Sequence, residues 1–419
     1  MIDFFITKYL RWYTKRNLKF DEINEIPQPK WKNDKKLLLY IHIPFCEELC
    51  PYCSFNRFKF NYKTAKKYFP RLRKELKLYY ERGFDFEGIY VGGGTPTIIV
   101  EELCETLNLA RELFSIKEIS CETNPNHLNE KIIENLLQVK VNRLSVGVQS
   151  FDDKILKQIE RYHKYGSSKE IQERIKLTLN RFDTLNIDMI FNFPTHTEAH
   201  IKKDCEIIKK LKVDQVTFYP LMVSESTQKL ISKNLGKFSF KNEKKFYYII
   251  LSMLEDEYFP STCWCFSRKK SMIDEYIIDY DEYIGTGSGS FGYYEGIIYS
   301  NTFSIKEYIE MVDKNKLPLK AFKKFSEIDK MRYDFLIKLF GTKLDKNFII
   351  KKYGKNFFRK LLKEILFFYL IGGIKIEKNQ LSLTRKGLYY WVVMMREFFI
   401  GVNNFRDYCR SLINDKWTF

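Results

Sequence analysis

Short apolar runs alternate with longer amphipathic stretches along the first half of the chain. Six runs have the length and the continuous apolar character of buried parallel strands: 37–45, 88–94, 118–125, 143–149, 186–193 and 215–221. The segments between them have helical periodicity: roughly 62–82, 100–113, 129–138, 152–182 and 198–211. This alternation predicts an α/β fold in which helices cover a parallel sheet. Because a complete eightfold barrel takes about 250 residues, we expect a partial (β/α)6 TIM-like barrel.

The pattern changes after residue 222. Residues 223–320 mix short strands with loops, and we expect them to form an extension that closes one side of the barrel. Helical segments dominate from residue 321, and the strand pair "IKIE" and "LSLT", joined by "KNQ", predicts a C-terminal winged-helix domain. The predicted domains are a basic helical segment over 1–36, the barrel over 37–222, the extension over 223–320 and the winged-helix domain over 321–419. A linker is predicted at "KLPLKAF", residues 316–322.

Composition narrows the class of protein. A hydrophobic content of 45% permits a sizeable core and excludes global disorder. The longest apolar runs fall short of the ~18–20 residues that span a bilayer, and the N-terminus lacks the features of a signal peptide. We therefore expect a cytoplasmic protein without a membrane span. The formal net charge of +18 fits either attraction for an anionic partner or a lysine-rich solvated surface, and composition does not choose.

Three cysteines follow the first predicted strand in the loop "CEELCPYC". Cys46, Cys50 and Cys53 have the spacing C-x3-C-x2-C, and clustered cysteines in a reducing compartment indicate metal or redox chemistry. Three thiolates on one loop can hold three irons of a [4Fe–4S] cube and leave the fourth iron open to a small chelating ligand. The alternatives are three buried cysteines without a ligand role, or a zinc site completed by His42. We expect His42 to lie under the site, since it alternates with strand residues.

Further polar and glycine-rich segments follow the other predicted strands. "GGGTPT" (Gly92–Thr97) comes after the second, Glu122 and Asn124 end the third, and Gln149 ends the fourth. In parallel α/β architectures the carboxyl ends of the strands form the rim on which active sites are built. The glycines let the backbone approach a ligand closely, although a tight strand-to-helix turn would require them too. The sequence thus predicts one site at this rim.

These segments together resemble a known family. "YIHIPFCEELCPYCSF", "GGGTPT", "ETNP", "RLSVGVQSFDDKILKQIERYH" and "IDMIFNFP" look like the radical S-adenosylmethionine superfamily, and more narrowly like the oxygen-independent coproporphyrinogen III oxidase-like family. The resemblance is strong over residues 37–221. It continues more weakly through "YIGTGSGSFGY" and the predicted winged helix.

The resemblance implies the cofactors and their ligands. A [4Fe–4S] cluster would be held by Cys46, Cys50 and Cys53, the predicted catalytic and metal-binding residues. S-adenosylmethionine would bind at the open iron. The resemblance does not decide whether a second molecule of S-adenosylmethionine binds. Reductive cleavage would yield a 5′-deoxyadenosyl radical that abstracts hydrogen from the substrate. A flavodoxin or ferredoxin would supply the electron, and its acidity would suit the positive charge. The implied cofactor-binding residues are Tyr40, Phe55, Gly93, Gly94, Thr95, Glu122, Gln149, Arg161 and Asp188.

The chain departs from the family pattern at two places. The decarboxylating oxidases carry a further cysteine where this chain has Phe55, which places it with sub-families that include haem chaperones and methyl-transferring members. The H-N-x-x-Y-W signature of the chaperones is missing. The corresponding region contains Cys263 and Cys265, for which we weigh packing against a substrate or haem contact. The same region contains the basic run 268–270, which could bind propionates or face solvent. It also contains Tyr276, Tyr280 and Tyr283, which could line a flat substrate pocket or pack in the core.

Three functions are compatible with these features. The first is a radical S-adenosylmethionine enzyme that acts on a tetrapyrrole, either a porphyrinogen or haem, by oxidative chemistry or methyl transfer. The second is a haem chaperone that retains the cluster and has haem as its ligand. The third is a nucleic-acid-modifying radical enzyme, suggested by the winged helix and the positive charge. We do not expect nucleic acid as a partner, since the sequence shows no separate RNA-binding module.

Overall fold

Six parallel strands form the centre of the protein. The computed structural model describes residues 6–8, 10–11, 21–22, 26–27, 37–271, 273, 276–411 and 413. The central strands are β2 (Leu37–Ile43), β5 (Gly88–Gly93), β6 (Glu118–Thr123), β7 (Arg143–Gln149), β8 (Thr184–Phe191) and β9 (Gln215–Pro220). They pair in chain order, each parallel to the next. All six agree with the predicted strands to within about two residues, and the predicted α/β partial-barrel fold is confirmed.

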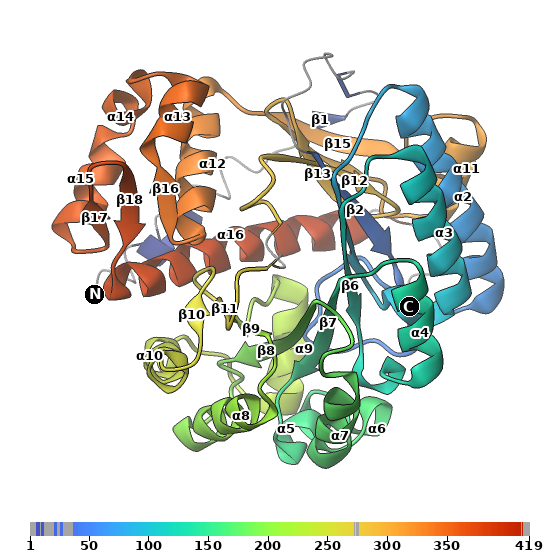
Figure 1. Ribbon diagram of the computed structural model, residues 1–419, viewed down its shortest axis with the longest axis horizontal. Helices are drawn as coiled ribbons and strands as arrows, with labels where there is room; N and C mark the ends of the chain where they lie inside the picture. Colours follow the sequence, from blue (N-terminus) through green and yellow to red (C-terminus); the bar gives the residue numbers. More distant parts are fainter. Residues whose placement is uncertain are drawn as a thin grey trace.

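Helices cover the outer face of this sheet, as Figure 1 shows. They pack through apolar side chains such as Leu72 and Leu107, which are fully buried. The helical segment predicted over 152–182 is divided into three helices, and a residue of positive φ lies at each break: Glu160 (59°) after the first and Gly166 (98°) after the second. The covering helices are α2 (Tyr62–Glu81), α3 (Val100–Leu113), α4 (Glu130–Gln138), α5 (Asp153–Gln158), α6 (Tyr162–Tyr165), α7 (Ser168–Thr178) and α8 (Glu198–Leu211).

The extension after residue 222 adds strands to both edges of the sheet. It was predicted to close one side of the barrel, and in the structure its strands pair at both edges of the sheet. On one edge, β11 (Cys265–Ser267) pairs with β9 and then with β10 (Phe259–Pro260). On the other edge, β12 (Glu282–Thr286) runs parallel to β2 and is followed by β13 (Phe291–Tyr294) and β14 (Ile297–Asn301). The helices of this part are α9 (Glu225–Leu235), α10 (Glu243–Leu254) and α11 (Ile305–Asp313).

The predicted linker at 316–322 is a strand instead. β15 (Leu319–Lys324) pairs with β14, and on its other side with the short strand β1 (Asp21–Glu22). Leu319 is buried, and this apolar anchor together with the ladder hydrogen bonds fixes the segment in the sheet. Most of the predicted N-terminal segment, residues 1–36, lies outside the described residues.

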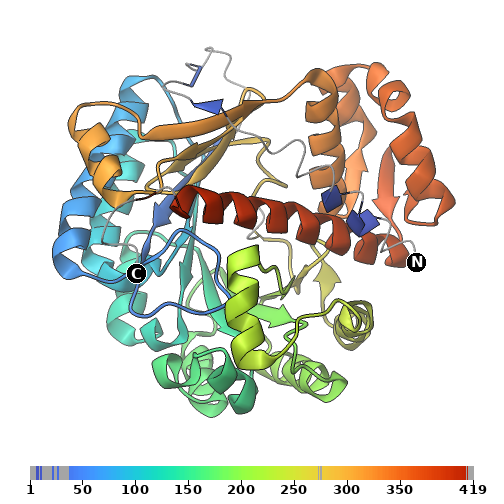
Figure 2. The ribbon, with the colours of Figure 1, turned by 180° about the vertical axis from the view of Figure 1, so that it is seen from behind.

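The C-terminal part contains the three-stranded sheet β16–β18–β17 and the helices around it. The last helix, α16 (Arg385–Ser411), leaves this part and crosses the molecule above the loop that follows β2, as Figure 2 shows. None of the described helices combines the length and the apolar character that spanning a bilayer requires. The other elements here are α12 (Glu327–Phe340), β16 (Lys343–Asp345), α13 (Lys346–Tyr353), α14 (Asn356–Lys360), α15 (Leu362–Leu370), β17 (Ile374–Ile376) and β18 (Gln380–Leu383).

Candidate functional site

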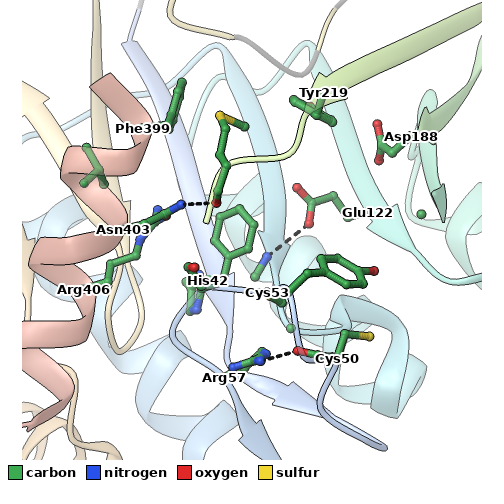
Figure 3. Close-up of a pocket in the computed structure, with 18 of the residues that line it drawn as sticks. His42, Cys50, Cys53, Arg57, Glu122, Asp188, Tyr219, Phe399, Asn403 and Arg406 are labelled. Atoms are coloured by element: carbon green, nitrogen blue, oxygen red, sulfur yellow. Dashed lines mark hydrogen bonds between the residues drawn. The ribbon is translucent and has the colours of Figure 1, made fainter. Parts of the chain in front are cut away.

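A cavity of about 370 Å³ lies at the carboxyl ends of the parallel strands. Its volume is within the range of sites that bind small molecules and cofactors. The sequence placed the predicted site residues on five separate segments, and the structure brings all of them to this one cavity (Figure 3). The predicted residues that line it are Tyr40, Cys46, Cys50, Cys53, Phe55, Gly93, Gly94, Thr95, Glu122, Gln149, Arg161 and Asp188.

The cysteine loop is closed at its base by a short two-stranded ladder. Strand β3 (Phe45–Cys46) pairs with β4 (Phe58–Lys59), and the amide of Phe58 donates to the carbonyl of Pro44 at 2.7 Å. Cys46 and Cys50 are buried, whereas Cys53 is half-buried. Burial, with the neighbouring Cys53 and Cys50 thiols, raises the pKa of Cys46 to about 12. Without a bound cation this thiol stays protonated, so a metal must displace its proton to bind there.

The geometry of the loop bears on which metal group fits it. Among the described residues, no three His, Cys, Asp or Glu side chains are placed to ligate a single ion. The three thiolates of a [4Fe–4S] cube bind three different irons, so their sulfurs need not converge on one point. His42, the candidate fourth zinc ligand, is buried with both ring nitrogens engaged. Tyr40 Oη lies 2.9 Å from Nδ1, and the carbonyl of Asn56 accepts at 2.8 Å from Nε2. Three thiols on one loop therefore fit a cubane.

Arg161 connects the cysteine loop to the end of β7. Its Nη1 donates to the hydroxyl of Tyr52 at 3.2 Å and to Sγ of Cys50 at 3.6 Å. Its guanidinium also lies 4.1 Å from the ring centroid of Tyr165 and donates to the carbonyl of Gly147. Hydrogen bonds to the sulfurs of a cluster tune its reduction potential, so Arg161 is placed to influence the metal group as well as the loop.

Two glycines let the end of β5 pass close to the cysteine loop. A Cβ at Gly94 would lie 2.5 Å from the carbonyl oxygen of Phe45, and one at Gly93 would lie 2.8 Å from the His42 ring. The amide of Thr95 donates to the same Phe45 carbonyl at 2.7 Å. Close backbone packing thus accounts for these glycines whether or not a ligand also touches them.

Acidic side chains line another side of the cavity. Glu122 accepts hydrogen bonds from the hydroxyl of Tyr90 at 2.8 Å and from the amide of Gly93 at 3.3 Å. Asp188 accepts from the hydroxyl of Ser145 at 2.7 Å and from Nδ2 of Asn186 at 2.8 Å. These contacts fix the two carboxylates, which present negative charge to a bound ammonium or hydrogen-bond acceptors to a ribose.

Gln149 lines the cavity in an unusual backbone conformation. Its φ is +75°, a region that residues other than glycine rarely adopt, and the pairing of β7 with β8 shifts register there. Strained residues of this kind concentrate at ligand-binding sites. Its position at a strand end was visible in the sequence, whereas the strain was not.

The sequence did not reveal the wall that α16 contributes. This helix carries no recognisable site motif, so no local signal in the sequence marks it. Arg406 and Asn403 point from α16 toward the cavity (Figure 3). Phe398, Phe399 and Val402 of the same helix also line it. Residues of other elements that line the cavity are Tyr219, Met222, Trp264, Phe291 and Tyr333.

Several residues considered from the sequence lie elsewhere. Arg268 donates to the carbonyl of Lys212 at 3.1 Å and is exposed, so the basic run does not reach the cavity. Cys263 and Cys265 are fully buried, and Sγ of Cys263 donates to the carbonyl of Phe340 at 3.4 Å. Tyr280 donates to Glu118 at 2.7 Å, whereas Tyr276 and Tyr283 do line the cavity.

Known proteins share both the sequence and the fold of this chain. Residues 40–208 match the model of the radical SAM superfamily. The haem chaperone HemW of Bacillus subtilis is 27% identical over 343 residues, covering 78% of this chain and 90% of the relative. The oxygen-independent coproporphyrinogen III oxidase of Helicobacter pylori is 25% identical over 388 residues, covering 85% and 84%. The solved coproporphyrinogen III oxidase of Escherichia coli superposes with a TM-score of 0.72 at 20% identity, covering 87% of this chain and 90% of that one.

These matches agree with the resemblance seen in the motifs: the chain is similar over most of its length to proteins of the oxygen-independent coproporphyrinogen III oxidase-like family, and residues 40–208 match the radical SAM superfamily. The superfamily match implies a [4Fe–4S] cluster and S-adenosylmethionine. The roles of the individual residues remain predictions.

Proposed function

We propose that this protein is a radical SAM enzyme that acts on a tetrapyrrole. The observation that carries the proposal is that the three-cysteine loop and a wall of aromatic side chains face the same cavity. Tyr40 and Tyr276 stack with centroids 6.0 Å apart, and Tyr90 lies beside them at 5.1 Å from Tyr276. Flat aromatic surfaces of this kind suit a flat macrocycle.

Cys46, Cys50 and Cys53 would hold the [4Fe–4S] cluster in this proposal. Bound there with S-adenosylmethionine, the cluster would supply the chemistry for abstracting hydrogen from an unactivated position of a substrate. The chain supplies binding and orientation. Glu122 and Asp188 offer fixed acceptors to the ammonium and ribose of the cofactor.

Exclusion of bulk water is the second contribution of the chain. Burial raises the pKa of Tyr40 well above its usual range, and the Glu122 carboxylate adds to the effect. The hydroxyl therefore stays protonated throughout the physiological range and remains a hydrogen-bond donor beside the cluster loop. Exclusion of bulk water from a cavity protects a radical from side reactions with solvent.

A haem chaperone is the second candidate, because relatives that align over most of the chain carry that name. Phe55 does not discriminate between the two functions. It stands where the decarboxylating oxidases carry a further cysteine, and the sub-families without that cysteine include haem chaperones as well as methyl-transferring members. Turnover distinguishes them. An enzyme consumes S-adenosylmethionine when its tetrapyrrole is present, whereas a chaperone binds haem without that dependence.

An electron donor is required if the protein turns over. A flavodoxin or ferredoxin would fit, because such donors are acidic and the chain has a formal net charge of +18. Opposite charges accelerate the encounter of two proteins and make its rate sensitive to salt.

The test is anaerobic reconstitution followed by turnover. The reduced protein is incubated with S-adenosylmethionine and either haemin or coproporphyrinogen III, and mass spectrometry follows the nucleoside and the tetrapyrrole. We expect 5′-deoxyadenosine and a tetrapyrrole of altered mass to appear together. C50A should lose the cluster absorbance and all nucleoside formation, whereas C104A, which changes a cysteine on α3, should keep both. Stable haem binding with no substrate-dependent nucleoside would favour the chaperone instead.

A further inference from the structure

Arg406 is a cavity-lining cation without an acidic partner. It lies on α16 and is half-buried. Among the described residues its guanidinium has one hydrogen-bond acceptor, Oδ1 of Asn403, at 2.8 Å from Nη1. No carboxylate of the described residues forms an ion pair with it. The next arginine of the helix differs, because Arg410 pairs with Asp407 and donates to the carbonyl of Phe55 at 2.8 Å. Arg406 therefore keeps Nε and Nη2 available to a ligand.

The other two arginines of the cavity are occupied by the protein itself. Arg161 donates to Tyr52, Cys50 and Gly147. Arg57 donates from Nη2 to the carbonyl of Cys50 at 2.6 Å and so belongs to the cysteine loop, although its buried Nε has no partner among the described residues. Arg406 differs from both, because it lies on α16, outside the cysteine loop, and donates its one hydrogen bond to a residue of its own helix.

The position of Arg406 is fixed by its neighbours. Its guanidinium carbon lies 4.7 Å from the ring centroid of Phe55 and 5.3 Å from that of Phe291, so two aromatic rings hold it. Asn403 orients it from the preceding turn, and Nδ2 of Asn403 in turn donates to the carbonyl of Met222 at 2.9 Å. A fork held in this way is preorganised, which lowers the entropy lost when it binds a planar anion.

The charges of the cavity are separated. Figure 3 shows Arg406 and Asn403 on one side and Asp188 on the opposite side, with the cysteine loop between them. Burial lowers the pKa of Arg406, and the nearby Arg410 adds to this effect. A guanidinium in such surroundings gains most from an anion that enters with a ligand. Cofactor groups that bind carboxylates, such as an ammonium, would lie at the side of the cavity that carries Asp188.

We infer that Arg406 binds a carboxylate of the substrate and so selects a flat macrocycle that carries acidic side arms. This inference rests on the proposed function and adds to it the residue that recognises the substrate, Arg406. The carboxylate would pair with Nε and Nη2 of Arg406, while the ring system lies against Tyr40 and Tyr276. A macrocycle without free carboxylates would lose this contact. Asn403 is then a positioning residue that acts through Arg406.

The experiment compares free acids with their methyl esters. The reconstituted protein is titrated anaerobically with haemin and with coproporphyrin III, and then with the methyl ester of each, using absorbance and fluorescence. The wild-type protein should bind at least one free acid roughly 10–100-fold more tightly than its ester, because hydrogen bonds to charged groups contribute about 1.5–3 kcal/mol. R406Q should bind acid and ester about equally, and R406K should recover part of the preference since it keeps the charge.

The matched control is R268Q, which removes the same charge from an exposed arginine outside the cavity. It should keep the wild-type preference, and iron content reports that each variant assembles. If R406Q keeps the preference too, or if the wild-type protein binds acid and ester alike, the inference is overturned while the proposed function stands. Failure of the wild-type protein to bind either tetrapyrrole would overturn both. The acid–ester comparison on the wild-type protein needs no variant.

Discussion

Individual buried acids show how strongly this fold depends on complete hydrogen bonding. Glu75 on α2 is fully buried, and no cationic side chain of the described residues pairs with it. It accepts from the hydroxyl of Tyr308 at 2.5 Å, from the amide of Gly287 at 2.8 Å and from Nδ2 of Asn301 at 3.0 Å. Burial nevertheless outweighs these hydrogen bonds and raises the pKa of Glu75 to about 7. The folded protein therefore holds a proton that the unfolded chain would release.

Stability should fall as the pH rises through this range. A carboxyl pKa raised from 4.5 to about 7 stabilises the fold fully below pH 4.5, and that contribution is lost as pH rises through about 7. E75Q mimics the protonated acid. Between about pH 5 and pH 8 its unfolding free energy should therefore fall by about 2–3 kcal/mol less than that of the wild-type protein. Urea unfolding at each pH measures this.

The control for this prediction is E112Q, which alters an exposed acid of α3 and should leave the wild-type pH dependence in place. Asp204 is also buried with a pKa raised to about 7, so some dependence should persist in E75Q. Identical slopes for E75Q and the wild-type protein would show that Glu75 does not hold the proton.

At the scale of elements, the loop between β12 and β13 supports the cysteine loop from below. This loop contains "GTGSGS", residues 285–290, which starts within β12. The structure shows a direct connection to the cysteine loop, since Nδ2 of Asn56 donates to the carbonyl of Ser288 at 3.1 Å. Gly289 also lines the cavity, so the loop is both a support and part of the wall.

Gly287 is where this support is tightest. Its φ is +90°, and a Cβ there would lie 2.5 Å from the carbonyl oxygen of His42 and from the hydroxyl of Tyr68. We expect G287A to cost about 1–3 kcal/mol more than the backbone strain alone. Because the displaced atoms lie under the cysteine loop, iron content after reconstitution should fall as well. Thermal unfolding and iron analysis measure the two effects.

G236A provides the matched control, because Gly236 has the same φ of +90° with no atom within 4 Å of an added Cβ. It carries the conformational strain without the collision. Equal stability and equal iron content in the two variants would mean that the loop moves aside freely and does not support the cluster site.

At the scale of the whole molecule, α16 connects the C-terminal domain to the barrel. Near its middle, Arg396 is almost fully buried and pairs with Glu243 of α10 and with Glu397, both of them buried. Farther along, Asn403 and Arg410 attach the helix to the β9–α9 segment and to the cysteine loop. One helix therefore joins the C-terminal part, the barrel and the candidate site.

Removing the central cation should loosen this connection. R396M leaves Glu243 buried without its charged partner, and we expect it to cost about 3–5 kcal/mol of unfolding free energy. The double variant E243Q/R396M should recover a large part of that loss, because the unpaired charge is gone. R385Q, at the exposed start of the same helix, removes a surface ion pair with Glu255 and an exposed hydrogen bond to Ser252, and should cost no more than about 1 kcal/mol. Denaturant unfolding separates these cases. A cost for R396M no larger than that for R385Q would contradict the role of this network.

The sequence alone was sufficient to predict those features that depend on the local pattern of apolar residues and on the chemistry of short motifs. Continuous apolar runs located the six central strands, because strands buried on both faces admit few polar residues. Strand polarity then placed Cys46, Glu122 and Gln149 at one rim, since parallel strands end on the same edge. The motifs supplied the family. These conclusions need only information carried by neighbouring residues.

Tertiary structure decided what depends on contacts between distant segments. Whether residues 316–322 link two domains or form β15 depends on the open edge of β14, which no local pattern reveals. Arg406 and Phe55 are 351 positions apart (406 minus 55) yet lie in contact, and only the packing of α16 brings them together. A helix pattern fixes which of its faces is buried but not which partner covers it. For that reason the sequence predicted the side of the cavity that carries the motifs, whereas the fold determined that α16 forms another wall of it.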